Sequence, residues 1–296
     1  MSKIIEIFGL DTHSTQDWER VIQEQRCPFR QRTCFKTRKS ESSVAIGTCS
    51  VLYGRDPRPI MICPERLLER GQIFADCLHL LTNHEPGNEF HVVPEVKIPG
   101  GNVDFFLASV RNGKVRDFVG IELQTMDTTG TVWPERQRFL REVNIIPSDD
   151  AEHSVRPYGI NWKMTAKTIL VQMHHKVKTF EHINKKLVLV VQNHLLNYMS
   201  NEFNFSHLNQ PARIGDSLHF HSYSMERIGE EYRIEMNARL STDDDGISQC
   251  LGLQAEARIE LEQILLILER KIGPMVIPPF FGALKSRGHA ACAKRC

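Results

Sequence analysis

Apolar and polar positions alternate along three consecutive segments in the middle of the chain. Residues 91–98 (HVVPEVKI), 103–110 (VDFFLASV) and 115–124 (VRDFVGIELQ) carry the spacing of β-strands, and the glycine-containing turns PGGN and RNGK separate them. Three strands joined by two short turns predict an antiparallel meander.

The remaining pattern predicts helices and shorter strands. Apolar residues at helical spacing predict helices over residues 14–25, 64–82, 161–182 and 247–271. Apolar runs predict strands over residues 186–192, 218–223 and 231–236. Residues 26–63 show little periodicity, and residues 273–296 read as an irregular tail. The order of the elements predicts an α/β or α+β protein with a small module at the front.

Composition places the chain among ordinary globular proteins. Its 296 residues are 41% hydrophobic, 25% charged and 8% aromatic, values that exclude disordered, collagen-like and membrane classes. The longest apolar run, Leu187 to Val191, is far too short to span a bilayer, and the N-terminus lacks the apolar stretch of a secretion signal. We therefore expect a cytoplasmic protein with no membrane partner.

The net charge of +1 neither requires nor excludes a nucleic-acid partner, but the basic residues are unevenly distributed. Two stretches are strongly basic: Arg26, Arg30, Arg32, Lys36, Arg38 and Lys39 in the first, and Lys163, Lys167, Lys176, Lys178, Lys185 and Lys186 in the second. Such patches can neutralise phosphates even in a nearly neutral protein. A solvated face is the alternative interpretation of either stretch alone.

The last two strands of the meander carry acidic and amide side chains. Glu122 and Gln124 project from the same face of their strand because side chains alternate, and Asp104 begins the strand before it. Asp104 can therefore approach Glu122 at one end of the sheet, and Glu95 on the preceding strand could add a third carboxylate. Clustered carboxylates repel one another unless a cation neutralises them, and oxygen ligands suit Mg²⁺.

This spacing is that of a nuclease active site in which glutamine replaces the usual lysine at the third position. A magnesium ion there could polarise a phosphoryl oxygen and lower the pKa of a bound water. Gln124 could orient that water, but it cannot supply positive charge. The same residues also fit a sheet end with solvated polar groups, and the spacing alone does not separate the two interpretations.

The segments PEVKIPGGNVDFFLASV (94–110) and DFVGIELQTMDTTGTVW (117–133) resemble the catalytic segment of the NotI family of type II restriction endonucleases. The resemblance implies a PD-(D/E)xK nuclease core, an α/β fold with a mixed sheet flanked by helices, in a Glu…Asp…Glu-x-Gln variant. It implies that Glu95, Asp104, Glu122 and Gln124 occupy the four catalytic positions. It also implies that Asp104, Glu122 and the backbone carbonyl of Leu123 bind Mg²⁺.

Eight cysteines in a cytosolic chain argue against a disulfide framework. Cys27, Cys34, Cys49 and Cys63 fall in the first quarter of the chain, with six, fourteen and thirteen residues between them. Four thiolates could hold zinc or iron, and four buried free cysteines are nearly as compatible with this spacing. The motifs CPF, GTCSV and ICPERLLE resemble the family's N-terminal four-cysteine metal site, which implies one structural Fe or Zn ion per chain.

The resemblance covers most of the chain to about residue 200. It implies an N-terminal helix and metal-binding module (1–63), a nuclease core with helical additions (64–272) and a C-terminal tail (273–296). The implied activity is that of a type II site-specific deoxyribonuclease, which uses Mg²⁺ to cleave double-stranded DNA at a GC-rich palindromic site and leaves 5′-phosphate ends. The implied setting is a restriction-modification system in the bacterial cytoplasm.

A palindromic site calls for a two-fold protein, so we expect a homodimer. Arg26, Arg30, Arg32 and residues 134–141 are the candidates for reading guanine. Three other interpretations stay open: a non-catalytic DNA-binding regulator with a structural metal finger, a repair or structure-specific nuclease, and a small-molecule enzyme with an acidic pocket. His219 and His221 could bind a metal, but a half-exposed strand face is the simpler account of their alternation.

Overall fold

The computed structural model describes residues 2–145, 158–253 and 265. The described residues 2–145 and 158–253 belong to one compact unit, Met1–Gln254. The boundary predicted between residues 63 and 64 falls inside this unit. The predicted helix beyond residue 253 and the predicted tail at 273–296 lie outside the described residues, apart from residue 265.

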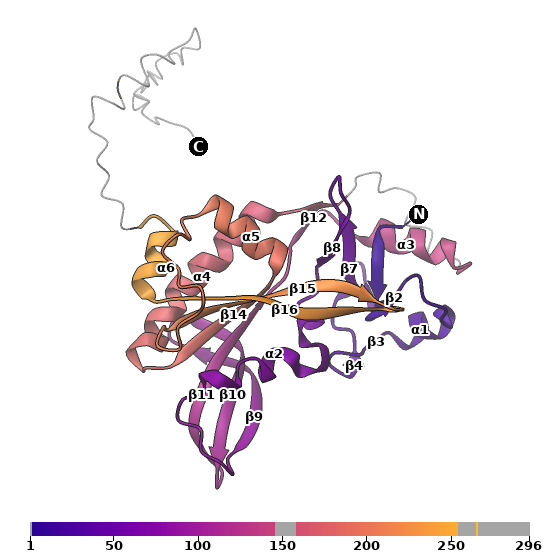
Figure 1. The fold of residues 1–296 in the computed structure, drawn as a ribbon. Helices are drawn as coiled ribbons and strands as arrows, with labels where there is room; N and C mark the ends of the chain where they lie inside the picture. Colours follow the sequence, from indigo (N-terminus) through magenta and orange to yellow (C-terminus); the bar gives the residue numbers. More distant parts are fainter. Residues whose placement is uncertain (1, 146–157, 254–264, 266–296) are drawn as a thin grey trace, which may run out of the picture. The chain divides into compact units, whose positions relative to one another are not determined.

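A six-stranded mixed sheet forms the centre of this unit (Figure 1). Its order is β16-β15-β14-β11-β10-β9, in which β9 to β11 form the predicted antiparallel meander. β11, β14 and β15 run parallel, and β16 returns antiparallel to β15. The strands span Glu89–Ile98 (β9), Gly101–Arg111 (β10), Lys114–Gln124 (β11), Lys186–Gln192 (β14), Leu218–Ile228 (β15) and Glu231–Thr242 (β16).

Three helices pack on one face of this sheet: α4 (Trp162–His182), α5 (Asn193–Glu202) and α6 (Asp244–Cys250). Helix α4 joins the parallel strands β11 and β14 and confirms the helix predicted over residues 161–182. All seven residues of β14 are buried, Leu187 and Leu189 on the helical face and Val188 on the other. A strand covered on both faces is a continuous apolar run, which is the pattern that predicted it.

The opposite face is covered by a broken helical segment: η1 (Pro64–Gly71), α2 (Gln72–Ala75) and η2 (Leu78–Leu80). A single helix over residues 64–82 was therefore a wrong prediction. The chain turns at Arg70 and Gly71, whose φ angles of 51° and 65° cannot continue a right-handed helix. Leu67 and Cys77 are buried, whereas Leu78 is 37% exposed.

The first part of the chain forms a second sheet of order β2-β1-β7-β8, to which α1 and two small ribbons are added. Helix α1 begins later than predicted, because the Asp17 carboxylate caps it by accepting a hydrogen bond from the Arg20 N–H. The bounds are Ile4–Ile7 (β1), Leu10–Asp11 (β2), Trp18–Glu24 (α1), Arg26–Cys27 (β3), Arg32–Thr33 (β4), Thr37–Arg38 (β5), Glu41–Ala45 (β6), Thr48–Tyr53 (β7) and Arg58–Met61 (β8).

Two further elements lie between the meander and α4. They are helix α3 (Trp133–Glu142) and the pair of β12 (Thr128–Thr129) with β13 (Gly159–Ile160). Across the described ranges, every helix is too short or too polar to cross a membrane. At its carboxyl end, the parallel strand β11 continues toward β12 and α3, and β14 continues directly into helix α5.

Candidate active site

Asp104 and Glu122 lie opposite each other on the neighbouring strands β10 and β11. Phe105 pairs with Ile121, and the antiparallel register continued by one residue faces Asp104 with Glu122. Asp104 Oδ2 also accepts a hydrogen bond from the Leu123 N–H at 2.8 Å. This bond orients the Asp104 carboxylate toward the last residues of β11, so the two acids meet at this end of the sheet.

Glu95 lies on the other side of Asp104. Val96 pairs with Val103 on strands β9 and β10, so the next position faces Glu95 with Asp104. Glu95 is exposed and has a φ of 54°, which interrupts the regular pairing there. Burial raises the pKa of Asp104, and the charge of Glu95 raises it further. The three predicted carboxylates therefore form one row across the meander.

A lysine on helix α4 completes this row. Lys176 Nζ donates a hydrogen bond to Glu122 Oε1 at 2.6 Å, and both residues are buried, 6% and 4% exposed. Burial raises the pKa of Glu122 to about 7, the charge of Asp104 raises it as well, and Lys176 opposes both effects. The site thus contains one ammonium group against two neighbouring acids, the buried Glu122 and the half-buried Asp104.

The burial of Lys176 departs from the interpretation of the second basic stretch as a solvated face, which holds for the exposed Lys163, Lys167 and Lys178. Lys186 in the same stretch is also buried, and its ammonium donates to the Gly215 carbonyl. The burial of Lys176 could have been predicted from the spacing of the helix. Ile169, Met173 and Phe180 form a buried stripe, and Lys176 lies on that stripe between Met173 and Phe180. A lysine on the apolar stripe of a helix needs a buried partner, and here the partner is Glu122.

Gln124 projects from the same side of β11 as Glu122. It is half-buried, and its Nε2 donates to the Thr125 carbonyl at 2.6 Å. The hydrogen bond to the Thr125 carbonyl therefore holds the Gln124 amide next to the carboxylate row. An amide in this position can bind water but brings no charge.

The N-terminal part of the chain reaches the carboxylate row through Arg30 and Glu65. Arg30 Nε lies 2.9 Å from Glu65 Oε2, and its guanidinium lies 5.4 Å from the centre of the Phe105 ring. Burial raises the pKa of Glu65, Arg30 lowers it and Asp104 raises it. The segment that carries the four cysteines is thus an immediate neighbour of the site.

The four predicted metal-binding cysteines are all buried: Cys27, Cys34, Cys49 and Cys63. Burial raises the pKa of Cys63, and the charges of Cys34 and Cys27 raise it too, so the thiols are electrostatic neighbours. Burial likewise raises the pKa of Cys27, and the nearby backbone N–H groups of Arg30 and Phe29 oppose this effect. Nevertheless, within residues 2–145 and 158–253, no three His, Cys, Asp or Glu side chains converge into a metal-binding group.

The candidates for base reading differ in accessibility. Arg26 and Arg32 are exposed. Arg136 is not, because it is 3% exposed, lies 4.8 Å from the Trp133 ring and donates to the Ile46 carbonyl at 2.8 Å. Arg136 therefore supports the fold around α3, whereas Arg138 and Arg141 of the predicted range 134–141 are exposed.

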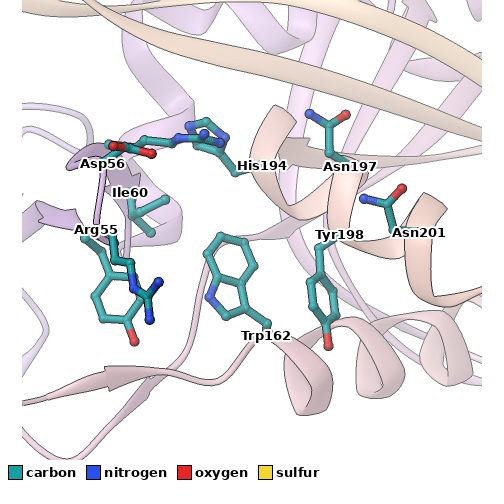
Figure 2. A pocket seen from close by; sticks show the side chains of 11 residues that line it. Arg55, Asp56, Ile60, Trp162, His194, Asn197, Tyr198 and Asn201 are labelled. Carbon is teal, nitrogen blue, oxygen red and sulfur yellow. The ribbon is translucent and has the colours of Figure 1, made fainter.

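A basic and aromatic pocket, which the sequence patterns did not indicate, lies between the β7–β8 turn, the start of α4 and helix α5. Figure 2 shows Arg55 from the turn on one side, Asn197 and Asn201 from α5 on the other, and Trp162 between them. The volume is about 390 Å³. The four predicted catalytic residues are not among its lining residues.

Gln192, the last residue of β14, fixes the position of this pocket relative to the sheet. Its Oε1 accepts from the Met61 N–H at 2.9 Å and its Nε2 donates to the Pro59 carbonyl at 2.7 Å. Met126, just after β11, also donates its N–H to the Met61 carbonyl at 3.1 Å. The pocket therefore lies beyond the carboxyl ends of β11 and β14, the edge to which Glu122 also belongs.

His219 and His221 are fully buried, so the prediction of a half-exposed strand face was wrong. Strand β15 lies between β14 and β16, and η2 covers the face from which the two histidines project. The His79 ring stacks on His221 at 6.1 Å, and Cys77 Sγ lies 3.8 Å from His221 Nδ1. These contacts explain why both rings avoid solvent.

Comparison with known proteins identifies the family of the chain. The family described as Restriction endonuclease NotI matches residues 16–233, which is most of the chain and includes the carboxylate row, the four cysteines and Lys176. No curated protein matches the chain. The chain therefore belongs to the NotI family of restriction endonucleases and is a site-specific deoxyribonuclease.

Proposed function

We propose that the protein is a type II restriction endonuclease that uses Mg²⁺ to cleave double-stranded DNA at a GC-rich palindromic site. The observation that carries the proposal is the opposition of Asp104 and Glu122 at the edge of a mixed sheet, inside the segment that matches the family. Membership of the family supports a restriction-modification system of the bacterial cytoplasm as its setting.

Asp104, Glu122 and the Leu123 carbonyl would hold the magnesium ion. The fit rests on charge, because burial raises the pKa of both carboxyl groups, Glu95 adds to the rise at Asp104 and Asp104 adds to the rise at Glu122, which is the condition that a bound cation relieves. Hard oxygen donors are also the ligands that Mg²⁺ prefers. When bound, the ion would supply Lewis-acid activation of water and of the scissile phosphate.

In the proposed reaction, Gln124 orients the attacking water through its amide, and Glu95 supports the metal ion or a second ion. The water oxygen forms a bond to phosphorus while the bond from phosphorus to the 3′ oxygen breaks. The water loses a proton to solvent and the 3′ oxygen takes one up. The products are a 5′-phosphate and a 3′-hydroxyl, with no change in oxidation state.

Cys27, Cys34, Cys49 and Cys63 would hold one structural Fe or Zn ion. Their common burial and their electrostatic proximity support a shared site, and thiolate ligands select these metals over Mg²⁺. The role would be to order the segment that carries Arg30 to the carboxylate row. In this proposal the metal stabilises structure and takes no part in hydrolysis.

DNA would lie along the edge that holds the carboxylate row and the pocket of Figure 2. Arg55, Arg58, Asn197 and Asn201 supply the side-chain types that bind phosphates and the edges of guanine and adenine. The exposed Arg26 and Arg32 extend the basic surface. A palindromic target would be cut by a homodimer, one strand per subunit.

The test is incubation of the purified protein with GC-rich plasmid DNA in Mg²⁺ and in EDTA, followed by sequencing of the fragment ends. The proposal predicts discrete fragments in Mg²⁺ only, with one palindromic sequence at every end and 5′-phosphates that ligase can join. DNA binding without cleavage would contradict it and favour the non-catalytic regulator. Cleavage that depends on damage or branching would indicate a repair enzyme instead.

A further inference from the structure

The β9–β10 turn brings helix α4 unusually close to the carboxylate row. A Cβ atom at Gly100 would lie 2.5 Å from the His175 carbonyl oxygen, and one at Gly101 would lie 3.2 Å from Lys176 Cε. Both glycines have positive φ angles, 96° and 136°, which side chains rarely adopt. The two glycines therefore let the helix backbone approach until the ammonium of Lys176 reaches Glu122.

Charge balance alone is an incomplete explanation for this lysine. A buried ion pair loses the hydration of both groups, and a well-packed apolar pair is often as stable. Here the pair lies at the two acids proposed to bind the metal, and the neighbouring position where nuclease sites of this kind carry lysine holds Gln124. The site lacks an ammonium at residue 124 and has one at residue 176.

We propose that Lys176 supplies the active-site ammonium that Gln124 cannot supply, and that it contacts a non-bridging oxygen of the scissile phosphate. The proposal rests on the proposed function and adds a catalytic residue to it. Lys176 Nζ lies 2.6 Å from Glu122 Oε1, so a phosphate held beside Glu122 would be within reach of the ammonium. The ammonium stabilises the charge that develops on the phosphate oxygens during attack.

The test measures single-turnover cleavage of a plasmid cut by the wild-type protein, together with DNA affinity in Ca²⁺. Lys176→Met should lower the cleavage rate by about 10²-fold or more, the range for loss of one donor to a developing oxyanion. DNA affinity should change by less than about threefold, since binding comes from many phosphate contacts. Lys114→Met, at an exposed lysine that begins β11 and belongs to neither basic stretch, is the control and should leave the rate unchanged.

The decisive variant moves the lysine from residue 176 to residue 124. Lys176→Met combined with Gln124→Lys should recover cleavage at least about tenfold, because the new ammonium projects from β11 beside Glu122. A purely structural role for Lys176 predicts no recovery, since a lysine at residue 124 leaves the packing beneath α4 unrepaired. Cleavage by Lys176→Met within threefold of wild type, or a folded double variant with no recovery, would overturn the proposal.

If Lys176→Met does not fold, Lys176→Arg replaces it, because the guanidinium keeps a positive charge beside Glu122. Its different shape should still lower the cleavage rate about tenfold or more. Full activity of Lys176→Arg would overturn the proposal in favour of charge balance. Failure of the wild-type protein to cleave in Mg²⁺ would refute the proposed function itself and is thereby distinguished from failure of this inference.

Discussion

Arg66 provides the sharpest test of how the N-terminal segment is joined to the nuclease sheet. Its side chain is 1% exposed, and its guanidinium donates to Glu6 on β1 at 2.9 Å, to Glu69 at 2.8 Å and to the Tyr232 carbonyl on β16 at 2.7 Å. Arg66→Met would leave Glu6, itself 1% exposed, without its cation. Breaking a buried pair in this way costs about 3–5 kcal/mol.

At roughly 2–4 °C per kcal/mol for a chain of this size, the melting temperature should fall by about 6–20 °C. Urea unfolding followed by circular dichroism gives the free energy directly. Arg20→Met is the control, because Arg20 forms an exposed pair with Glu24, 73% and 49% exposed, and should leave stability unchanged. The double variant Glu6→Gln/Arg66→Met should regain part of the loss. A loss below about 1 kcal/mol for Arg66→Met would refute the reasoning.

Three further variants test other parts of the structure. Burial lowers the pKa of His221 from 6.5 to about 3, so the unfolded chain takes up a proton there first and the folded protein loses stability as the pH falls below 6.5. His221→Gln should therefore reduce the drop in unfolding free energy between pH 6.5 and pH 5 by about 2 kcal/mol, and identical drops in both proteins would contradict this. Gly120→Val should cost about 1–3 kcal/mol in urea unfolding, because a Cβ there lies 2.4 Å from the Phe180 ring, and an unchanged midpoint would show that the ring moves freely. Arg58→Ala in the pocket should weaken DNA binding and reduce the salt slope by about 1, and a slope equal to that of the wild type would remove Arg58 from the interface.

The sequence predicted the elements whose patterns are local. Alternation and glycine turns identify the meander, and the apolar run from Leu187 to Val191 identifies β14. The register follows from the short turns, which is why Asp104 and Glu122 could be expected to approach each other. The segment 64–82 failed because its helical spacing conceals a turn at Arg70 and Gly71 that tertiary contacts of Arg66 stabilise.

What the sequence did not predict depends on contacts between distant segments. Lys176 is 54 residues from Glu122, and its partner became known only once α4 was placed on the sheet. The burial of His221 depends on η2, which lies more than a hundred residues earlier in the chain. The pocket of Figure 2 joins three segments whose separate patterns carry no shared motif.

The central claim is that the Asp104 and Glu122 row is the catalytic site, and Asp104→Ala tests it most directly. The measurement is single-turnover cleavage in Mg²⁺, with DNA affinity in Ca²⁺ and unfolding in urea determined on the same protein. The account predicts a loss of about a thousandfold or more in cleavage rate, as for several kcal/mol of metal-derived stabilisation, with DNA affinity and the folded state retained. Cleavage within tenfold of the wild-type rate would show that hydrolysis takes place elsewhere in the protein.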